Sequence, residues 1–206
     1  KTFSIKKAAT VNFSELKDDY APKLMVKELP KQGSQKMEKY NYPERAAQRS
    51  SASATLSPLV KGISIQANPW GYSTPNDNDM AISDSGFVIS VVNTNIYVKN
   101  IATGSVSPNK SLAAFTAPTN SLHEEFDPKV IYDPDKDRFV LVCLVGFVDT
   151  TSKIIVGFSQ TSNPAGAWNL YTLPGDPLNY GLWSDYPMIS MTEKELNLGF
   201  KIGRKW

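Results

Sequence analysis

The feature that most constrains the fold is a series of short apolar runs joined by turn-forming residues. Residues 138–147 (RFVLVCLVGF) are almost wholly apolar, as expected of a strand that is buried on both faces. Residues 129–132 precede this run across the segment DPDKD, and residues 154–159 follow it. The segment NPAG then leads to a fourth run at 168–173, and both connecting segments have turn composition. Four short strands joined by tight turns predict one antiparallel meander.

The meander then restarts, because residues 185–190 (DYPMIS) echo residues 127–132 (DPKVIY). A similar unit precedes it, with predicted strands at 80–83, 87–93, 95–100 and 112–115 and a polar bridge at 105–111. A third unit begins with predicted strands at 188–191 and 196–200. The units recur after about 50 and about 58 residues, a plausible repeat length for a propeller. A four-stranded unit that repeats in this way is typical of a β-propeller blade.

The predicted fold class is therefore all-β, with four-stranded antiparallel blades in an incomplete ring. Residues 63–206 hold about two blades and part of a third, whereas a closed ring needs four to eight. We expect these residues to belong to a longer protein. Expressed alone, they should expose an apolar sheet face and an open strand edge, which promote association.

Residues 1–62 are predicted to form an extended N-terminal arm or linker. Prolines at 22, 30, 43 and 58 prevent a long helix, and residues 14–18 favour at most a helical turn. The arm is expected to lie along the propeller, to join a partner, or to be an unstructured terminus. Residues 63–67 read as a short edge strand, and the following Trp70 as a packing residue.

The same motifs resemble a known family. The segments DPKVIYDPDKDRF, IIVGFSQTSNPAGAW and WSDYPMI are similar to the repeat of secreted bacterial β-propellers, many of them surface proteins of Bacteroidetes-type bacteria. The resemblance covers about residues 68–200 and implies a secreted or cell-surface protein of a Gram-negative bacterium, exported by the type IX secretion system. It also implies that Asp149-Thr150-Thr151 is similar to an O-glycosylation acceptor of such proteins.

The distribution of charge and the length of the apolar runs argue against nucleic-acid binding and against a membrane-spanning helix. Residues 1–62 carry 12 Lys and Arg against 6 Asp and Glu, and the remaining residues carry 10 against 14. The basic residues are scattered, so the dense footprint of a nucleic-acid-binding surface is missing. No run approaches the roughly 20 apolar residues of a membrane helix. The one cysteine, Cys143, lies in the apolar strand and is expected to be buried and inert.

One pattern suggests a metal. Asp133, Asp135 and Asp137 alternate like the opening of a calcium loop, which makes a structural calcium the one cofactor to consider. The glycine and the closing glutamate of that loop are replaced here by Arg138 and Leu144. An ordinary hairpin turn with solvated carboxylates explains the pattern equally simply and is the default interpretation.

No catalytic residue is assigned from the sequence, and no residue contacting a ligand can be named. His123 is the only histidine, and its acidic neighbours predict an exposed loop position. Paired carboxylates for glycoside hydrolysis are available in Glu124, Glu125, Asp127 and Asp185. Asp127 and Asp185 stand at equivalent unit starts, which favours a repeated structural role, such as hydrogen bonding to backbone amides.

Three functions remain open at this point. The first is a non-catalytic extracellular propeller that acts as a binding, adhesion or scaffold module, with a glycan as one possible ligand. The second is a propeller glycoside hydrolase, although residues 63–206 hold only the arginines Arg138 and Arg204, which disfavours a sialidase-like arginine cluster. The third is a stable subunit of an outer-membrane or secretion complex, bound through the N-terminal arm.

Overall fold

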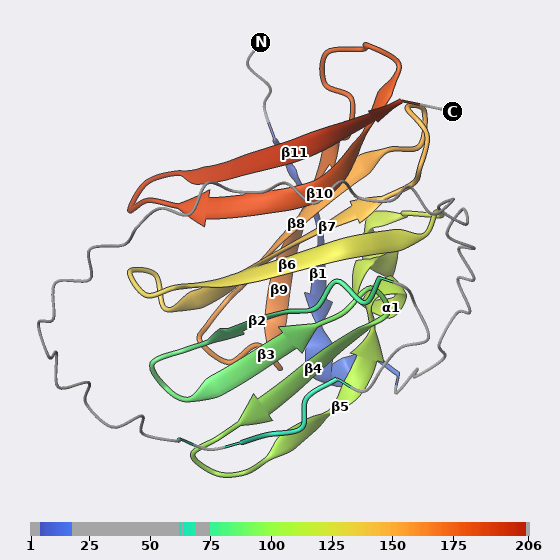
Figure 1. The fold of residues 1–206 in the computed structure, drawn as a ribbon. Helices are drawn as coiled ribbons and strands as arrows, with labels where there is room; N and C mark the ends of the chain where they lie inside the picture. Colours follow the sequence, from blue (N-terminus) through green and yellow to red (C-terminus); the bar gives the residue numbers. More distant parts are fainter. Residues whose placement is uncertain (1–4, 18–61, 63, 69–74, 205–206) are drawn as a thin grey trace, which may run out of the picture. The chain divides into compact units, whose positions relative to one another are not determined.

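A computed structural model describes residues 5–17, 62, 64–68 and 75–204 of the chain (Figure 1). The chain divides into two compact units, one of Lys1–Val26 with Ala67–Trp206 and the other of Lys27–Gln66. In the second unit the described residues, 62 and 64–66, have no regular structure. The edge strand predicted at 63–67 is therefore wrong in its described part. Trp70 and the prolines at 22, 30, 43 and 58 lie outside the described residues.

The first unit is built almost entirely from strands. In chain order its described elements are β1 (Lys7–Asn12), the 3-10 turn η1 (Phe13–Glu15), β2 (Asp79–Ile82), β3 (Phe87–Val91), β4 (Asn95–Asn100), β5 (Val106–Ser111), α1 (Leu112–Thr116), the 3-10 turn η2 (Ala117–Thr119), β6 (Glu125–Asp133), β7 (Arg138–Val145), β8 (Lys153–Ser159), β9 (Ala167–Pro174), β10 (Leu182–Met191) and β11 (Leu196–Arg204).

The strands form three antiparallel sheets. The first has the order β2-β3-β4-β5, the second β1-β9-β8-β7-β6, and the third is the hairpin β10-β11. The predicted meander is confirmed, since β6, β7, β8 and β9 pair in sequence order with antiparallel register. The all-β class is also confirmed. Figure 1 shows β6 lying between β2 and β10, and these strands pack on either side of it.

The second sheet is buried on both faces, as the apolar run at 138–147 predicts. On β7, Phe139, Leu141 and Cys143 belong to one apolar cluster, which they share with residues of β3 and β4 in the first sheet. Val140 and Val142 point the other way, into a second cluster against which residues of β10 and β11 pack. Each face of this sheet is thus covered by a neighbouring sheet, and alternation along the strand explains why every residue is apolar.

One predicted strand is wrong. The run at 112–115 forms the helix α1, and the fourth strand of the first sheet is the polar stretch Val106–Ser111 that was predicted as a bridge. Ser111 caps the helix, because its hydroxyl accepts a hydrogen bond from the Ala114 amide at 3.0 Å. Leu112 and Phe115, three positions apart, both turn into the core. As a sheet-edge strand, β5 needs few apolar residues and tolerates a proline.

The described part of the N-terminal arm belongs to the second sheet. Strand β1 pairs antiparallel with β9, and the chain continues with hydrogen bonds of 3.0 Å from the Phe13 amide to Gly166 O and from the Ser14 amide to Ala165 O. Val11 and Phe13 are buried in the core, where Trp168 also lies. Of the three arrangements expected for the arm, these residues therefore follow the one in which it lies along the sheets.

Candidate functional site

Three strands that lie side by side share a backbone feature, which falls just before β2 and inside β6 and β10. Asp77 before β2, Asp127 in β6 and Tyr186 in β10 have φ values of 43, 49 and 46°. The register of β6 shifts between Phe126 and Lys129, at Asp127, and that of β10 shifts between Asp185 and Met188, at Tyr186. Positive φ is uncommon for residues other than glycine, so its recurrence marks a repeated bulge. The bulges match Asp127 with Tyr186, one residue beyond the match with Asp185 predicted from the sequence.

Polar side chains connect the two bulges with the segment before β2. The Tyr186 amide donates to Asp127 Oδ2 at 2.9 Å, which links the third sheet to the second. The Asp127 amide donates to Asn93 Oδ1 at 2.7 Å, and Asn93 Nδ2 donates to Asp77 Oδ2 at 2.8 Å. We call Asp77, Asn93 and Asp127 the carboxyl relay. It joins Asp127 of the second sheet to two segments that flank the first, because Asn93 follows β3 and Asp77 precedes β2. The bond from the Tyr186 amide extends the link to the third sheet.

Asp127 is the electrostatically unusual member of the relay. Its residue is only 8% exposed, and burial, ahead of the nearby carboxyls of Asp77 and Asp185, raises the pKa of Asp127 from 3.8 to about 6. The hydrogen bond from the Tyr186 amide opposes this rise. The carboxyl is therefore neutral under mildly acidic conditions and becomes charged near neutrality.

The other carboxylates considered for catalysis do not gather with Asp127 into one exposed site. Asp185 pairs with Lys201 Nζ at 3.4 Å. Glu125 Oε1 accepts a hydrogen bond from the Thr116 hydroxyl at 2.6 Å, while Glu124 is exposed. The predicted role in binding a backbone amide is confirmed for Asp127, but Asp185 instead makes an ion pair.

The remaining candidates from the sequence lie elsewhere. His123 is exposed in the connection before β6, as predicted, and Cys143 is fully buried. Burial raises the pKa of the Cys143 thiol well above its usual value. This agrees with the prediction of an unreactive cysteine.

The three aspartates proposed for calcium occupy the hairpin between β6 and β7. Asp133 is buried, and it accepts from the Lys136 amide at 3.2 Å and from Arg138 Nε at 3.3 Å. Asp137 accepts from the Tyr132 hydroxyl, and this bond raises the pKa of Tyr132 to about 12. Asp135 is exposed. Two of the three carboxylates thus have protein partners, and the described residues contain no group of three or more His, Cys, Asp or Glu arranged to hold a metal.

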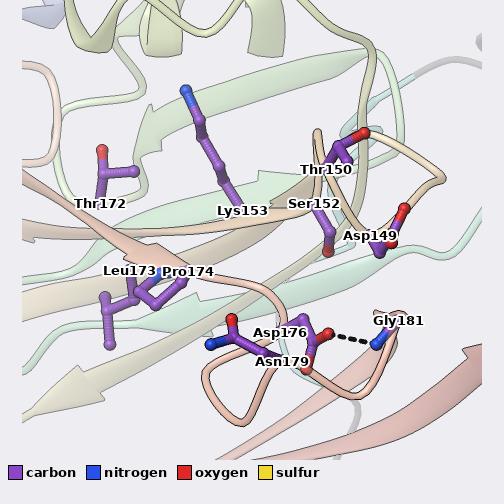
Figure 2. A pocket seen from close by; sticks show the side chains of 10 residues that line it. All are labelled: Asp149, Thr150, Ser152, Lys153, Thr172, Leu173, Pro174, Asp176, Asn179 and Gly181. Atoms are coloured by element: carbon purple, nitrogen blue, oxygen red, sulfur yellow. Dashed lines mark hydrogen bonds between the residues drawn. The ribbon is translucent and has the colours of Figure 1, made fainter.

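A pocket of about 680 Å³ lies where the β7–β8 and β9–β10 loops meet the ends of β8 and β9 (Figure 2). Its lining is divided about equally between polar and apolar surface, and its polar part carries hydroxyl, amide, carboxylate and ammonium groups. The lining residues are Asp149, Thr150, Ser152, Lys153, Thr172, Leu173, Pro174, Asp176, Asn179 and Gly181. The Thr172 hydroxyl oxygen is buried and has no hydrogen-bond partner within the described protein.

Hydrogen bonds hold the loops around this pocket in one shape. Asp176 accepts from the amides of Tyr180, Gly181 and Leu182 at 3.1, 2.8 and 3.2 Å, and these bonds, led by Tyr180, lower its pKa. Figure 2 shows the bond to Gly181 across the β9–β10 loop.

The two loops are also tied to each other. The Gly175 amide donates to Ser152 O at 2.9 Å, and the Ser184 amide donates to Ser152 Oγ at 3.2 Å. These bonds hold the two sides of the pocket against each other.

The sequence analysis missed most of this site. Asp77 stands in the oxygen-rich segment 76–79, which the sequence indicates to be an ordinary turn. Its link to Asn93 and Asp127 could not be predicted, because contacts between different sheets leave no fixed spacing in the chain. Most of the pocket residues outside β8 and β9 stand in turn-like segments, where polar composition is ordinary. One signal was present: Pro128 and Pro187 each follow a bulge residue, and aligning the prolines would have matched Asp127 with Tyr186.

No known protein family matches this chain, and neither a curated protein nor a solved structure is similar to it. Among the described residues, none of the helices has the length and apolar character needed to span a membrane.

Proposed function

We propose that the three sheets are successive blades of a β-propeller. The observation that supports this most strongly is the serial packing of the sheets, with the second covered on one face by the first and on the other by the third. The first strands of the units, β2, β6 and β10, lie side by side, as the inner strands of adjacent blades do. The positive φ that recurs at Asp77, Asp127 and Tyr186 also supports a repeat.

We further propose that the protein acts as a non-catalytic binding module, with the pocket between the β7–β8 and β9–β10 loops as its ligand site. Loops held by a rigid sheet are a common place for binding residues. The lining offers donors and acceptors from Thr150, Thr172 and Asn179, flanked by the charged Asp149 and Lys153. This mixture suits a ligand rich in hydroxyl groups, and a glycan is the class that fits best. The extracellular location follows from the sequence resemblance and belongs to the same proposal.

A glycoside hydrolase is the less favoured function, because Asp127, whose pKa is raised by burial, does not line the pocket. Asp127 is nearly buried, and one of its oxygens is already bound by the Tyr186 amide. A general acid must reach the bond it protonates within hydrogen-bond distance. Asp176, which does line the pocket, is occupied by three backbone amides that lower its pKa.

The test is binding of the purified protein to an array of defined bacterial and host oligosaccharides, followed by calorimetric titration of the strongest hit. We expect Asp149→Ala and Lys153→Ala each to weaken binding about tenfold, since each removes a polar contact to the ligand. Asp135→Ala is the matched control, because it removes an exposed carboxylate from the hairpin between β6 and β7. Saturable binding that both pocket variants leave unchanged would contradict the assigned site, and binding to no oligosaccharide would contradict the ligand class.

A further inference from the structure

The part of the pocket formed by β8 and β9 holds a cation and a hydroxyl that have no partner among the described residues. We propose that Lys153 and Thr172 form an anion-binding subsite, so that the pocket takes an acidic glycan, one that carries a carboxylate or a sulfate group. This inference rests on the proposed function and deepens it, since it names the chemistry that the ligand must present.

The register of β8 and β9 places the two residues on one face of the sheet. Lys153 lies opposite Pro174, and Ile155 lies opposite Thr172. Opposed residues of an antiparallel pair share a face, as do residues two positions apart, so Lys153 and Thr172 are diagonal neighbours. Their Cβ atoms are then about 7 Å apart, a gap that a long side chain can bridge. Figure 2 shows both side chains rising from the sheet in the same direction, whereas that of Leu173 points the other way.

The charge of Lys153 is not neutralised within the described part of the chain, where its ammonium forms neither an ion pair nor a hydrogen bond. The register places Glu125 opposite Val145, and Val145 opposite Lys153. Glu125 thus stands two strands away, about 9–10 Å along the sheet. Its carboxylate accepts the Thr116 hydroxyl at 2.6 Å. An anion that enters the pocket therefore meets a cation with no carboxylate bound to it.

The Thr172 hydroxyl adds a donor beside this cation. Its Oγ1 is buried and has no hydrogen-bond partner within the described protein, which is an unfavourable state for a hydroxyl. Because Oγ1 is out of contact with water, a ligand must displace a neighbouring group to reach it, and the long Lys153 side chain is the flexible diagonal neighbour. A carboxylate or sulfate could then accept from Nζ and from Oγ1 together, and such charge-assisted bonds are stronger than neutral ones.

The acidic residues of the pocket lie at its other end. Figure 2 shows Asp149 and Asp176 on the same side as Gly181, away from Lys153 and Thr172. Asp176 accepts the Gly181 amide at 2.8 Å, and a Cβ added to Gly181 would lie 3.8 Å from Asp149 Oδ2. Both carboxylates thus face the β9–β10 loop. The pocket has a cationic end at the sheet and an acidic end at the loops, which suits a glycan with its anionic group at the sheet and its hydroxyls at the loops.

The test uses matched pairs of oligosaccharides on the array and in calorimetric titration of the intact protein. Uronic acid oligosaccharides are compared with their carboxyl-reduced counterparts, and sulfated oligosaccharides with their desulfated counterparts, so the two pair types show which anionic group is read. We expect the acidic member of a pair to bind about tenfold more tightly than its neutral counterpart. Lys153→Met should reduce this ratio to about one, Lys153→Arg should keep it, and Thr172→Val should reduce it about threefold.

Lys194→Met is the matched control, since Lys194 is exposed in the turn between β10 and β11 and should leave the ratio unchanged. A second readout needs no variant: the ratio in the wild type should fall between about 0.05 and about 0.5 M NaCl, because salt screens charge.

Binding of acidic and neutral members with equal affinity would overturn the subsite and leave the glycan function in place. A ratio that resists salt, or that Lys153→Met or Thr172→Val leaves unchanged, would also overturn it. Binding of neither member of any pair would contradict the proposed function itself, and this inference with it.

Discussion

Replacing Phe13 by alanine tests whether the N-terminal strand is part of the fold. Phe13 is 1% exposed and lies in the core that also contains Trp168 and Phe115, although it stands more than 150 residues before Trp168 in the chain. Truncation of a fully buried phenylalanine costs about 3–5 kcal/mol through lost transfer energy and the cavity left behind. For a protein of this size that loss corresponds to a fall in Tm of about 6–20 °C.

The assay is urea unfolding followed by tryptophan fluorescence, with thermal unfolding as a second measurement. Ile5→Ala is the matched control from the same segment. Ile5 is 50% exposed, so its truncation should change the free energy of unfolding by no more than about 0.5 kcal/mol. Equal effects of the two substitutions would refute the reasoning, because they would show that β1 does not bury Phe13 against the second sheet.

Two further predictions concern the middle sheet. Gly146→Ala should destabilise the fold by about 1–3 kcal/mol in thermal unfolding, since φ is 75° and the added Cβ would lie 2.5 Å from Thr151 Oγ1. Gly104→Ala shares the φ of 75° but meets nothing within 4 Å, so a cost at Gly146 no greater than at Gly104 would exclude the steric clash. Cys143 should resist a thiol reagent such as DTNB in the folded protein and react only on unfolding, because its thiol is fully buried. Rapid stoichiometric labelling of the native protein at neutral pH would contradict its position in the core.

The prediction from the sequence was most accurate for the strand that is buried on both of its faces. The run at 138–147 has one explanation, a strand with a partner sheet on each face, and the structure places it in β7 between two apolar clusters. The prediction failed where the position of a segment in the sheet decides its structure more than its composition does. Val106–Ser111 has few apolar residues, yet at the edge of the first sheet it needs only one neighbouring strand. The apolar run that follows it forms a helix because Ser111 caps α1 and the short turn still buries Leu112 and Phe115.

Strand β1 illustrates a second limit. Val11 and Phe13 are two positions apart, as expected of a strand, but the proline-containing segment after them suggested an arm without a fixed partner. Its partner, β9, lies more than 150 residues along the chain, and no local pattern in either segment encodes such a pairing. Burial of Trp168 gives the physical reason for the pairing. Its ring packs edge-on against Phe115 at 5.4 Å, and the core around it is completed by residues of the N-terminal segment.

The carboxyl relay shows why the repeat is hard to recognise from side chains alone. The units share a backbone conformation at Asp77, Asp127 and Tyr186, but the side chain at that position changes from acid to tyrosine. A backbone bulge places its own amide beside the preceding unit, and any acceptor there can satisfy it. Asp127 supplies the acceptor for Tyr186, whereas the amide of Asp127 uses Asn93, which Asp77 in turn holds. What Asp127 and Tyr186 share is thus a backbone amide that needs a hydrogen-bond acceptor.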